Sequence, residues 1–303
     1  MRNALYILLG IACFTFNSKS SEAQYKIDFG FKVGLSNYLG EMGGDEKTRR
    51  GFISDMKIAQ SRWAIGGFGR YRINNMFAVN VGLNYARIQG SDALSSNRGR
   101  RGRNLHFRND MLDLYARGEV YFFNENDVGN RGRYALDFQA FAFGGVAGIM
   151  HSPKALDASG KYTKLRPLQT EGVKYSTIAM GLPVGIGFFF TKKRKHRFGW
   201  EISWTHTLTD YLDDVSSVYA GGLSPEVEAM ANRRPALANV PGIPSIDNYV
   251  VGSKRGDPTH NDNYLYTQFK YSYLMKGFNT FYTQSYGWLG NRKRGVRKVR
   301  AKF

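Results

Sequence analysis

The sequence is poor in cysteine (1), proline (8) and acidic residues (24) among 303 residues. The lone Cys13 excludes a disulfide scaffold and a cysteine-based zinc site. No apolar run reaches the ~18 residues of a membrane-spanning helix, which excludes that class as well. Aromatic residues (15%) and glycines (35) are abundant instead. That composition is typical of membrane β-barrels, whose strands of about 9–11 residues escape hydropathy averaging.

Residues 1–23 predict an export signal. Arg2 supplies a positive start, residues 4–16 an apolar stretch, and residues 21–23 a cleavage site with small residues at its two key positions. We expect cleavage after residue 23. Lipidation at Cys13 is the alternative, which Gly10 disfavours because leucine is usual at that position. Export argues against nucleic acid as a partner, although the formal net charge is +19.

The rest of the chain alternates between apolar and small or polar residues. Such a period of two indicates β-strands. The clearest stretch runs from Ile178 to Phe190, where glycines separate large apolar residues. The fifth stretch is apolar on both faces in its middle, which is compatible with a β-bulge. The expected strands lie near residues 27–35, 63–73, 77–85, 112–122, 134–150, 178–190, 198–204 and 265–273.

The two faces of these strands distinguish a membrane barrel from a soluble sandwich. A sandwich would bury the large apolar residues, whereas a membrane barrel turns them to lipid and fills its interior with the other face. Here that other face carries glycines and charges of both signs, which can pair inside: Asp113, Arg117, Glu119, Glu201 and Lys270. Aromatic residues near strand ends suit interfacial girdles: Tyr38, Trp63, Tyr85, Trp200, Trp204, Tyr264 and Tyr273.

Connection lengths give the expected topology. The odd connections (38–62, 87–108, 151–175 and 209–263) are long, and the even ones (74–75, 124–133 and 191–197) are short. Outer-membrane barrels have long outer loops and short periplasmic turns. We therefore predict an all-β fold, an eight-stranded antiparallel up-and-down transmembrane β-barrel over residues 24–274 in the outer membrane. Both termini would be periplasmic, and the lumen of so small a barrel would be closed.

Basic residues gather at the expected periplasmic side, in the sixth connection and in a basic aromatic tail, residues 275–303. They can be solvated or contact phospholipid headgroups. They can also bind an acidic periplasmic partner, which the aromatic residues of the tail favour. The hypothetical partner-binding residues are Lys192, Lys193, Arg194, Lys195, Arg197, Arg292, Lys293, Arg294, Arg297, Lys298 and Arg300. A second cluster, expected to meet lipopolysaccharide phosphates, comprises Arg98, Arg100, Arg101, Arg103 and Arg108.

Five loop segments occur together: SNYLG (36–40), PKA (153–155), LRPLQTEG (165–172), TDYLDDV (209–215) and RGDPTHNDNY (255–264). This combination resembles the PorG-like outer-membrane barrels of the Bacteroidota type IX secretion system. The resemblance implies a structural component of the secretion and gliding machinery. It also implies two partners that build a periplasmic ring, a PorK-type lipoprotein and a PorN-type protein. The motif residues are Asn37, Tyr38, Gly40, Pro167, Thr170, Glu171, Gly172, Asp210, Tyr211, Asp213, Asp214, Arg255, Gly256 and Asp262.

No catalytic constellation is evident, and we expect neither an enzyme nor a cofactor. Ser203 and His206 are three residues apart and so lie on opposite faces of one strand. The other histidines (His106, His151, His196 and His260) are expected at the surface. Carboxylates of the last long loop could bind calcium, but their spacing favours pairing with Lys254 and Arg255: Asp210, Asp213, Asp214, Asp257 and Asp262. The alternative functions are a free-standing OmpA-like structural barrel and, less favoured, a lipid-modifying barrel enzyme.

Overall fold

The computed structural model describes residues 27–40, 42, 58–125, 128, 136–193, 195–237, 240–275 and 286–287. The expected export signal, Arg194 and the six basic residues expected between positions 292 and 300 lie outside the described residues.

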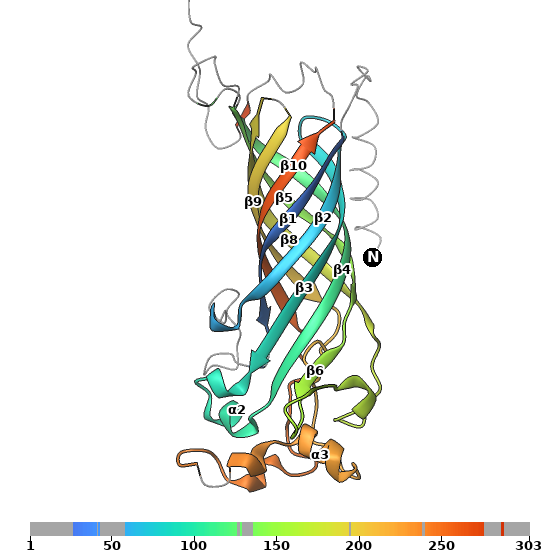
Figure 1. The fold of residues 1–303 in the computed structure, drawn as a ribbon, viewed down its shortest axis with the longest axis vertical. Helices are drawn as coiled ribbons and strands as arrows, with labels where there is room; N and C mark the ends of the chain where they lie inside the picture. The colour runs from blue at the N-terminus through green and yellow to red at the C-terminus, as the bar shows by residue number, and fades with distance from the viewer. Residues whose placement is uncertain are drawn as a thin grey trace, which may run out of the picture.

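Eight long antiparallel strands form a closed barrel (Figure 1). They are β1 (Ile27–Leu39), β2 (Arg62–Arg72), β3 (Phe77–Ser91), β4 (His106–Glu125), β5 (Leu136–Met150), β8 (Ile178–Lys192), β9 (His196–Thr207) and β10 (Asn263–Leu274). Each strand pairs with the next in the chain, and β10 pairs back with β1, for example at Phe31 opposite Tyr271. The predicted eight-stranded up-and-down barrel is confirmed.

The connections are sorted by length as predicted. Residues 73–76, 126–135 and 193–195 join strands at one end, which we call the turn end. The four long connections gather at the opposite end, the loop end, where α2, α3 and β6 lie in Figure 1. The additional elements are η1 (Ile58–Gln60), η2 (Asp92–Leu94), α2 (Arg98–Arg103), β6 (Pro153–Leu156), β7 (Tyr162–Lys164), η3 (Arg166–Leu168), α3 (Pro225–Ala231), η4 (Arg234–Leu237), η5 (Ile246–Tyr249) and β11 (Tyr286–Gly287).

None of the described helices has the length and apolar character needed to cross a membrane.

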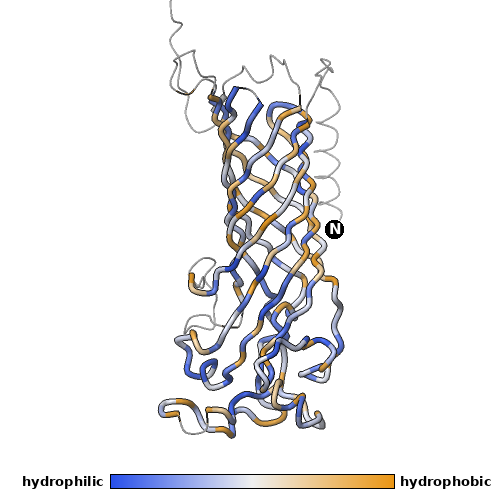
Figure 2. The backbone as a smooth tube through the Cα atoms, in the orientation of Figure 1, coloured by the Kyte–Doolittle hydropathy of each residue, from blue (hydrophilic) through white to orange (hydrophobic). Residues whose placement is uncertain are grey.

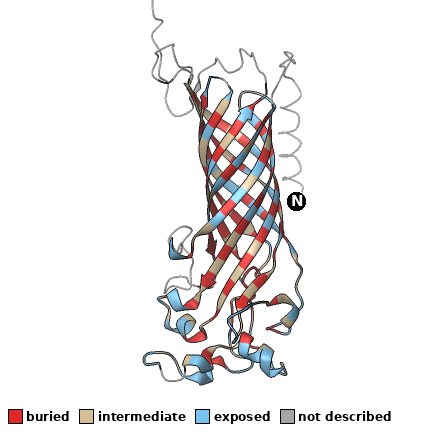
Figure 3. Ribbon diagram, viewed as in Figure 1, coloured by how far each residue is buried: buried red, intermediate tan, exposed pale blue. Residues whose placement is uncertain are grey.

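The barrel is apolar outside and polar inside. On β1, Phe29 and Phe31 are each 56% exposed, whereas Asp28, Lys32 and Ser36 on the alternate face are buried. The same alternation runs along the other strands, as hydropathy and burial show (Figures 2 and 3). A soluble sandwich would bury the large apolar side chains, so this arrangement is the one that membrane barrels present to lipid.

The expected bulge lies one strand earlier than predicted. β5 keeps a constant register with β8, but the pairing of β4 with β5 shifts between Tyr121 and Phe123, which leaves Phe122 as the extra residue. The phase of β4 therefore reverses, and Asn124 is buried.

Two of the expected girdle residues point inward instead. Tyr38 and Tyr264 are 3% and 0% exposed, because they occupy the inward phase of β1 and β10. Trp63, Tyr85 and Tyr273 do lie on the outer face.

Candidate functional site

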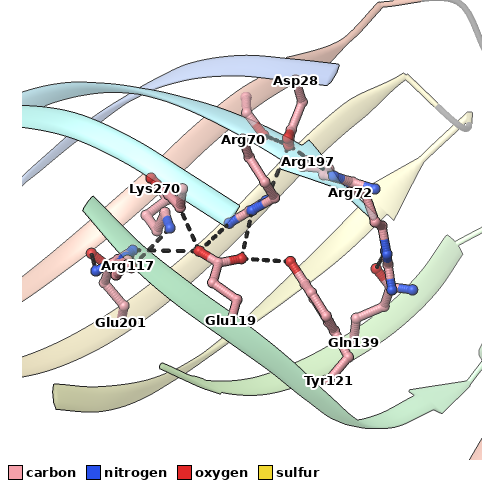
Figure 4. Close-up of polar contacts among 12 residues, drawn as sticks. Asp28, Arg70, Arg72, Arg117, Glu119, Tyr121, Gln139, Arg197, Glu201 and Lys270 are labelled. Carbon is pink, nitrogen blue, oxygen red and sulfur yellow. Dashed lines mark hydrogen bonds and ion pairs between the residues drawn. The ribbon is translucent and has the colours of Figure 1, made fainter. Parts of the chain in front are cut away.

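The middle of the lumen is filled by ion pairs that cross from wall to wall (Figure 4). Glu201 of β9 accepts hydrogen bonds from three cations: Lys32 of β1 at 3.1 Å, Arg117 of β4 at 2.5 Å and Lys270 of β10 at 2.8 Å. All four side chains are buried. Buried charges are tolerable only when paired and hydrogen-bonded, and this carboxylate meets that condition on every side.

A second ion-pair layer lies nearer the turn end. Arg70 contacts Asp28 at 3.0 Å and Glu119 at 2.7 Å, and the Tyr121 hydroxyl donates to Glu119 at 2.6 Å. Beside it, Tyr121 packs with buried aromatic side chains of β5 and β8, among them Phe141 and Phe189. These layers join opposite walls, so the lumen is packed with side chains rather than open.

Arg197 belongs to this interior, which corrects its assignment to an exposed basic face. Its guanidinium lies 2.8 Å from Asp28 and is 2% exposed. Arg197 precedes the outward-facing Phe198, so the alternation of β9 turns it inward. Lys192, Lys193 and Lys195 are exposed at the turn end, as expected.

At the loop end, the mouth of the barrel is covered by residues 210–215. The Tyr38 hydroxyl lies 2.6 Å from Asp213 Oδ2 and 2.5 Å from Asp262 Oδ1, and both oxygens can accept its hydrogen bond. Asp262 also accepts the backbone N–H of Leu212 at 2.9 Å. Leu212 and Val215 are fully buried over the mouth and pack with its core cluster.

Asp214 connects this cover to the loop that follows β5. It accepts hydrogen bonds from the hydroxyls of Thr170 (2.5 Å) and Tyr175 (2.6 Å). Its φ of 69° is left-handed, a conformation in which aspartate is enriched. Burial raises the pKa of Asp214, against the opposing effect of the nearby Arg255 guanidinium. Burial and the Asp214 carboxylate together raise the pKa of Tyr175.

Glu171 and Arg255 form the second tie between these loops. Arg255 donates to Glu171 Oε1 at 2.7 Å and to the backbone carbonyl of Asp214 at 2.5 Å. The other Glu171 oxygen accepts the backbone N–H and hydroxyl of Ser217 at 2.9 and 2.7 Å. Of the carboxylates expected to pair with Arg255, Asp214 lies 3.8 Å from its guanidinium, and Glu171 is the closer partner. Lys254 is exposed, and its ammonium lies 3.6 Å from Asp257.

The second long connection, between β3 and β4, joins the same network. Arg103 is buried and makes two contacts with Asp92, at 2.8 and 2.9 Å, while it donates to the backbone carbonyl of Arg255 at 2.5 Å. The prediction that Arg103 belongs to a surface cluster is therefore wrong. Arg98 and Arg101 are exposed on α2, whereas Arg108 lies on the wall of β4.

The remaining motif residues divide into three groups. Gly40 and Gly256 lie so close to neighbouring atoms that a side chain would not fit. A Cβ would lie 1.9 Å from the Tyr38 hydroxyl at Gly40 and 2.6 Å from the Ser216 backbone at Gly256. Asn37 (bonded to Ser61), Asp210 and Tyr211 lie at the mouth, and the Tyr211 ring stacks on Tyr175 at 4.7 Å. Pro167 and Gly172 are exposed and lie outside the network.

The sequence interpretation missed Asn109, Asp92 and Tyr175. Asn109 is fully buried and donates to the Leu212 carbonyl at 2.7 Å. Its position in the inward phase of β4, beyond the predicted start of that strand, was the available signal. Asp92 and Tyr175 lie in irregular loops, where no periodicity marks them.

The histidines are dispersed. Ser203 faces the interior while His206 lies on the other face, bonded to Asn263 at 2.8 Å. His151 is buried rather than at the surface, with its ring stacked on Tyr175. Across the part of the chain that the structure describes, no three His, Cys, Asp or Glu side chains are placed to hold a metal ion.

The chain matches a protein family and is similar to solved structures. Residues 5–220 match the model of a family described as a domain of unknown function, DUF6089. No curated protein matches the chain. Among solved structures, the chain is similar to Ail, the attachment invasion locus protein of Yersinia pestis, in complex with the heparin analogue sucrose octasulfate. The identity is 10% and the TM-score 0.31, over 82% of this chain and 99% of Ail.

Proposed function

The chain belongs to the DUF6089 family, a domain of unknown function, and for this member we propose a structural role in the outer membrane. It would anchor or align the periplasmic ring of a type IX secretion and gliding machinery. The observation that carries the structural role is the closed barrel: Glu201 bridges three walls, and residues 210–215 cover the mouth. A packed lumen suits an anchor and not a conduit for secreted proteins.

The link to secretion rests on the resemblance of the loop segments. The geometry supports it because motif residues from three different loop segments are hydrogen-bonded to one another: Tyr38, Asp213 and Asp262 form one unit. The partners would be the PorK-type lipoprotein and the PorN-type protein. We place their contact at the turn end, where Lys192, Lys193 and Lys195 are exposed, and on the basic tail. Lipopolysaccharide and phospholipid would surround the barrel.

Affinity purification of the tagged protein from its native membrane in mild detergent, followed by mass spectrometry, tests the role. We expect both ring proteins to be recovered. Replacing Lys192, Lys193 and Lys195 by glutamine should reduce their recovery, as should deletion of residues 292–303. The matched control replaces exposed lysines of the loop end: Lys161, Lys164 and Lys174. A preparation with only the barrel and lipopolysaccharide would instead favour the free-standing OmpA-like barrel.

Orientation has its own test, because Cys13 is the only cysteine. A Ser159→Cys variant at the loop end should react with a membrane-impermeant maleimide on intact cells, and Lys193→Cys at the turn end should not. The reverse labelling pattern would put the turn end outside the cell, where it could not contact a periplasmic ring. We further propose that the protein is not an enzyme, so gene deletion should stop cargo secretion and leave the mass of lipid A unchanged.

A further inference from the structure

A group of basic side chains lies on the outer wall of the barrel near the loop end, at the level of the mouth. Arg87, Arg108 and Lys154 all occupy the outward phase of their strands, β3, β4 and β6. The strand register places Arg87 opposite Asp110 and Arg108 opposite Lys154. Three strands therefore contribute to one patch, which we call the wall cluster.

One carboxylate holds the three cations of the wall cluster. Arg87 Nε lies 2.6 Å from Asp110 Oδ1, while Arg108 Nη2 and Lys154 Nζ lie 3.4 and 3.5 Å from Asp110 Oδ2. Three positive charges against one negative charge leave a formal surplus of two. The cationic side chains are 24–27% exposed and Asp110 is 14% exposed, so the surplus is accessible from outside. Asp110 fixes the cations in place without neutralising them.

The wall cluster begins where the apolar outer face ends. Along β3 the outward residues are apolar from Phe77 to Tyr85, and the next outward residue is Arg87. The Trp63 ring lies 5.2 Å from that of Tyr85, and the Arg87 guanidinium lies 5.5 Å above Trp63. Tryptophan and tyrosine mark the membrane–water interface of outer-membrane barrels. The cations just beyond them are therefore at the level of lipid headgroups.

We propose that the wall cluster is a binding site for a phosphate group of lipid A in the outer leaflet. This inference rests on the proposed outer-membrane location, with the loop end outside. Guanidinium groups match phosphate oxygens with two parallel hydrogen bonds, and lysine adds a point charge. The surplus of two charges suits a phosphate monoester dianion better than the monoanionic phosphodiester of a phospholipid. An ordinary surface ion pair would need one cation for Asp110, not three.

The test is native mass spectrometry of the full-length protein in mild detergent, with defined lipids added. The probes are bisphosphorylated lipid A, lipid A with both phosphates removed, phosphatidylglycerol and inorganic phosphate. The test variant carries Arg87→Gln, Arg108→Gln and Lys154→Gln. The matched control makes the same charge change at three exposed loop residues outside both basic clusters: Lys161→Gln, Lys174→Gln and Lys254→Gln.

We expect the wild type and the control to retain bisphosphorylated lipid A, and the test variant to retain about tenfold less. Equal retention by both variants would overturn the site, and so would equal retention of the dephosphorylated lipid. Equal retention of phosphatidylglycerol, or displacement by millimolar inorganic phosphate, would overturn the assignment to lipid A. Heat-modifiable migration confirms that each variant is folded. Failure of the folded wild type to insert into vesicles would refute the outer-membrane role itself, whereas insertion without selective retention refutes only this site.

Discussion

Tyr38 and Asp262 are 224 positions apart in the chain and share a 2.5 Å hydrogen bond at the mouth of the barrel. Tyr38 is near the end of the first strand, and Asp262 immediately precedes the last. Asp213, in the cover, shares the same hydroxyl at 2.6 Å. The bond therefore ties the seam where the barrel closes to the segment that covers it, and it couples closure of the sheet to order in the loops.

Replacing Tyr38 by phenylalanine should loosen the cover while the barrel stays folded. The variant keeps the ring, which packs edge-on against Phe107 at 4.8 Å, and loses the donor to two buried carboxylates. The hydroxyl has a single proton, which the two carboxylates share, and a hydrogen bond to a charged group stabilises by about 1.5–3 kcal/mol, so we expect a loss of that size. Urea unfolding in micelles measures it. Tyr85→Phe on the lipid-facing wall is the control, and equal midpoints for the two variants would contradict the role of the hydroxyl.

Replacing Arg255 by glutamine should release the last long loop. Arg255 is buried with Glu171, and removing one partner of a buried ion pair costs about 3–5 kcal/mol because the other charge is left unpaired. We expect fast chymotrypsin cleavage between β9 and β10. The adjacent Lys254→Gln, at a side chain that is 69% exposed, should leave cleavage unchanged. Slow cleavage of the Arg255 variant would show that the loop is ordered by other contacts.

The barrel could be predicted from the sequence because its signal is local. Phe29 faces outward and Lys32 faces the lumen, because successive side chains of a strand point to opposite faces and the two faces meet lipid and lumen. The same alternation would have corrected two wrong assignments, those of Arg197 and Tyr38. Arg197 precedes the outward Phe198, and Tyr38 is in phase with the inward Ser36, so the alternation itself turned both inward.

The network at the mouth could not be predicted in this way. Arg255 and Glu171 are 84 positions apart and lie in irregular loops, so no period relates them. The resemblance of the loop segments indicated that these residues belong together without saying which pairs they form. The regrouping of Arg108 with Arg87 and Lys154 likewise needed the register of β4 with β3 and β6.

Replacing Glu201 by glutamine should destabilise the whole barrel and not only its loops. Lys32, Arg117 and Lys270 would then lose their shared carboxylate inside a packed lumen. We expect a loss of about 3–5 kcal/mol in urea unfolding, against no change for Glu226→Gln, an exposed residue of α3. Adding Lys270→Met should recover part of the loss, because one uncompensated cation is removed. A double variant less stable than Glu201→Gln alone would contradict this account.

Acidification should weaken the mouth through His151. Burial, together with the nearby Arg166 guanidinium, lowers the pKa of His151 to about 4, from about 6.5 in an unfolded chain. The unfolded chain therefore binds a proton before the folded one does. The stabilising contribution of neutral His151 is fully present above about pH 6.5 and is lost as the pH falls toward 4. Through this one group, the free energy of unfolding changes by at most ~1.4 kcal/mol per pH unit.

The matched variant for this pH dependence is His151→Phe, which retains a ring against Tyr175 and cannot titrate. Urea midpoints of both proteins between pH 7 and pH 4.5 measure the difference between their slopes. We expect the wild type to lose stability more steeply than the variant over this range, because only the wild type gains a proton at this position on unfolding. Parallel slopes would mean that His151 is as accessible to protons in the folded barrel as in the unfolded chain, and that the cover does not exclude water from its ring.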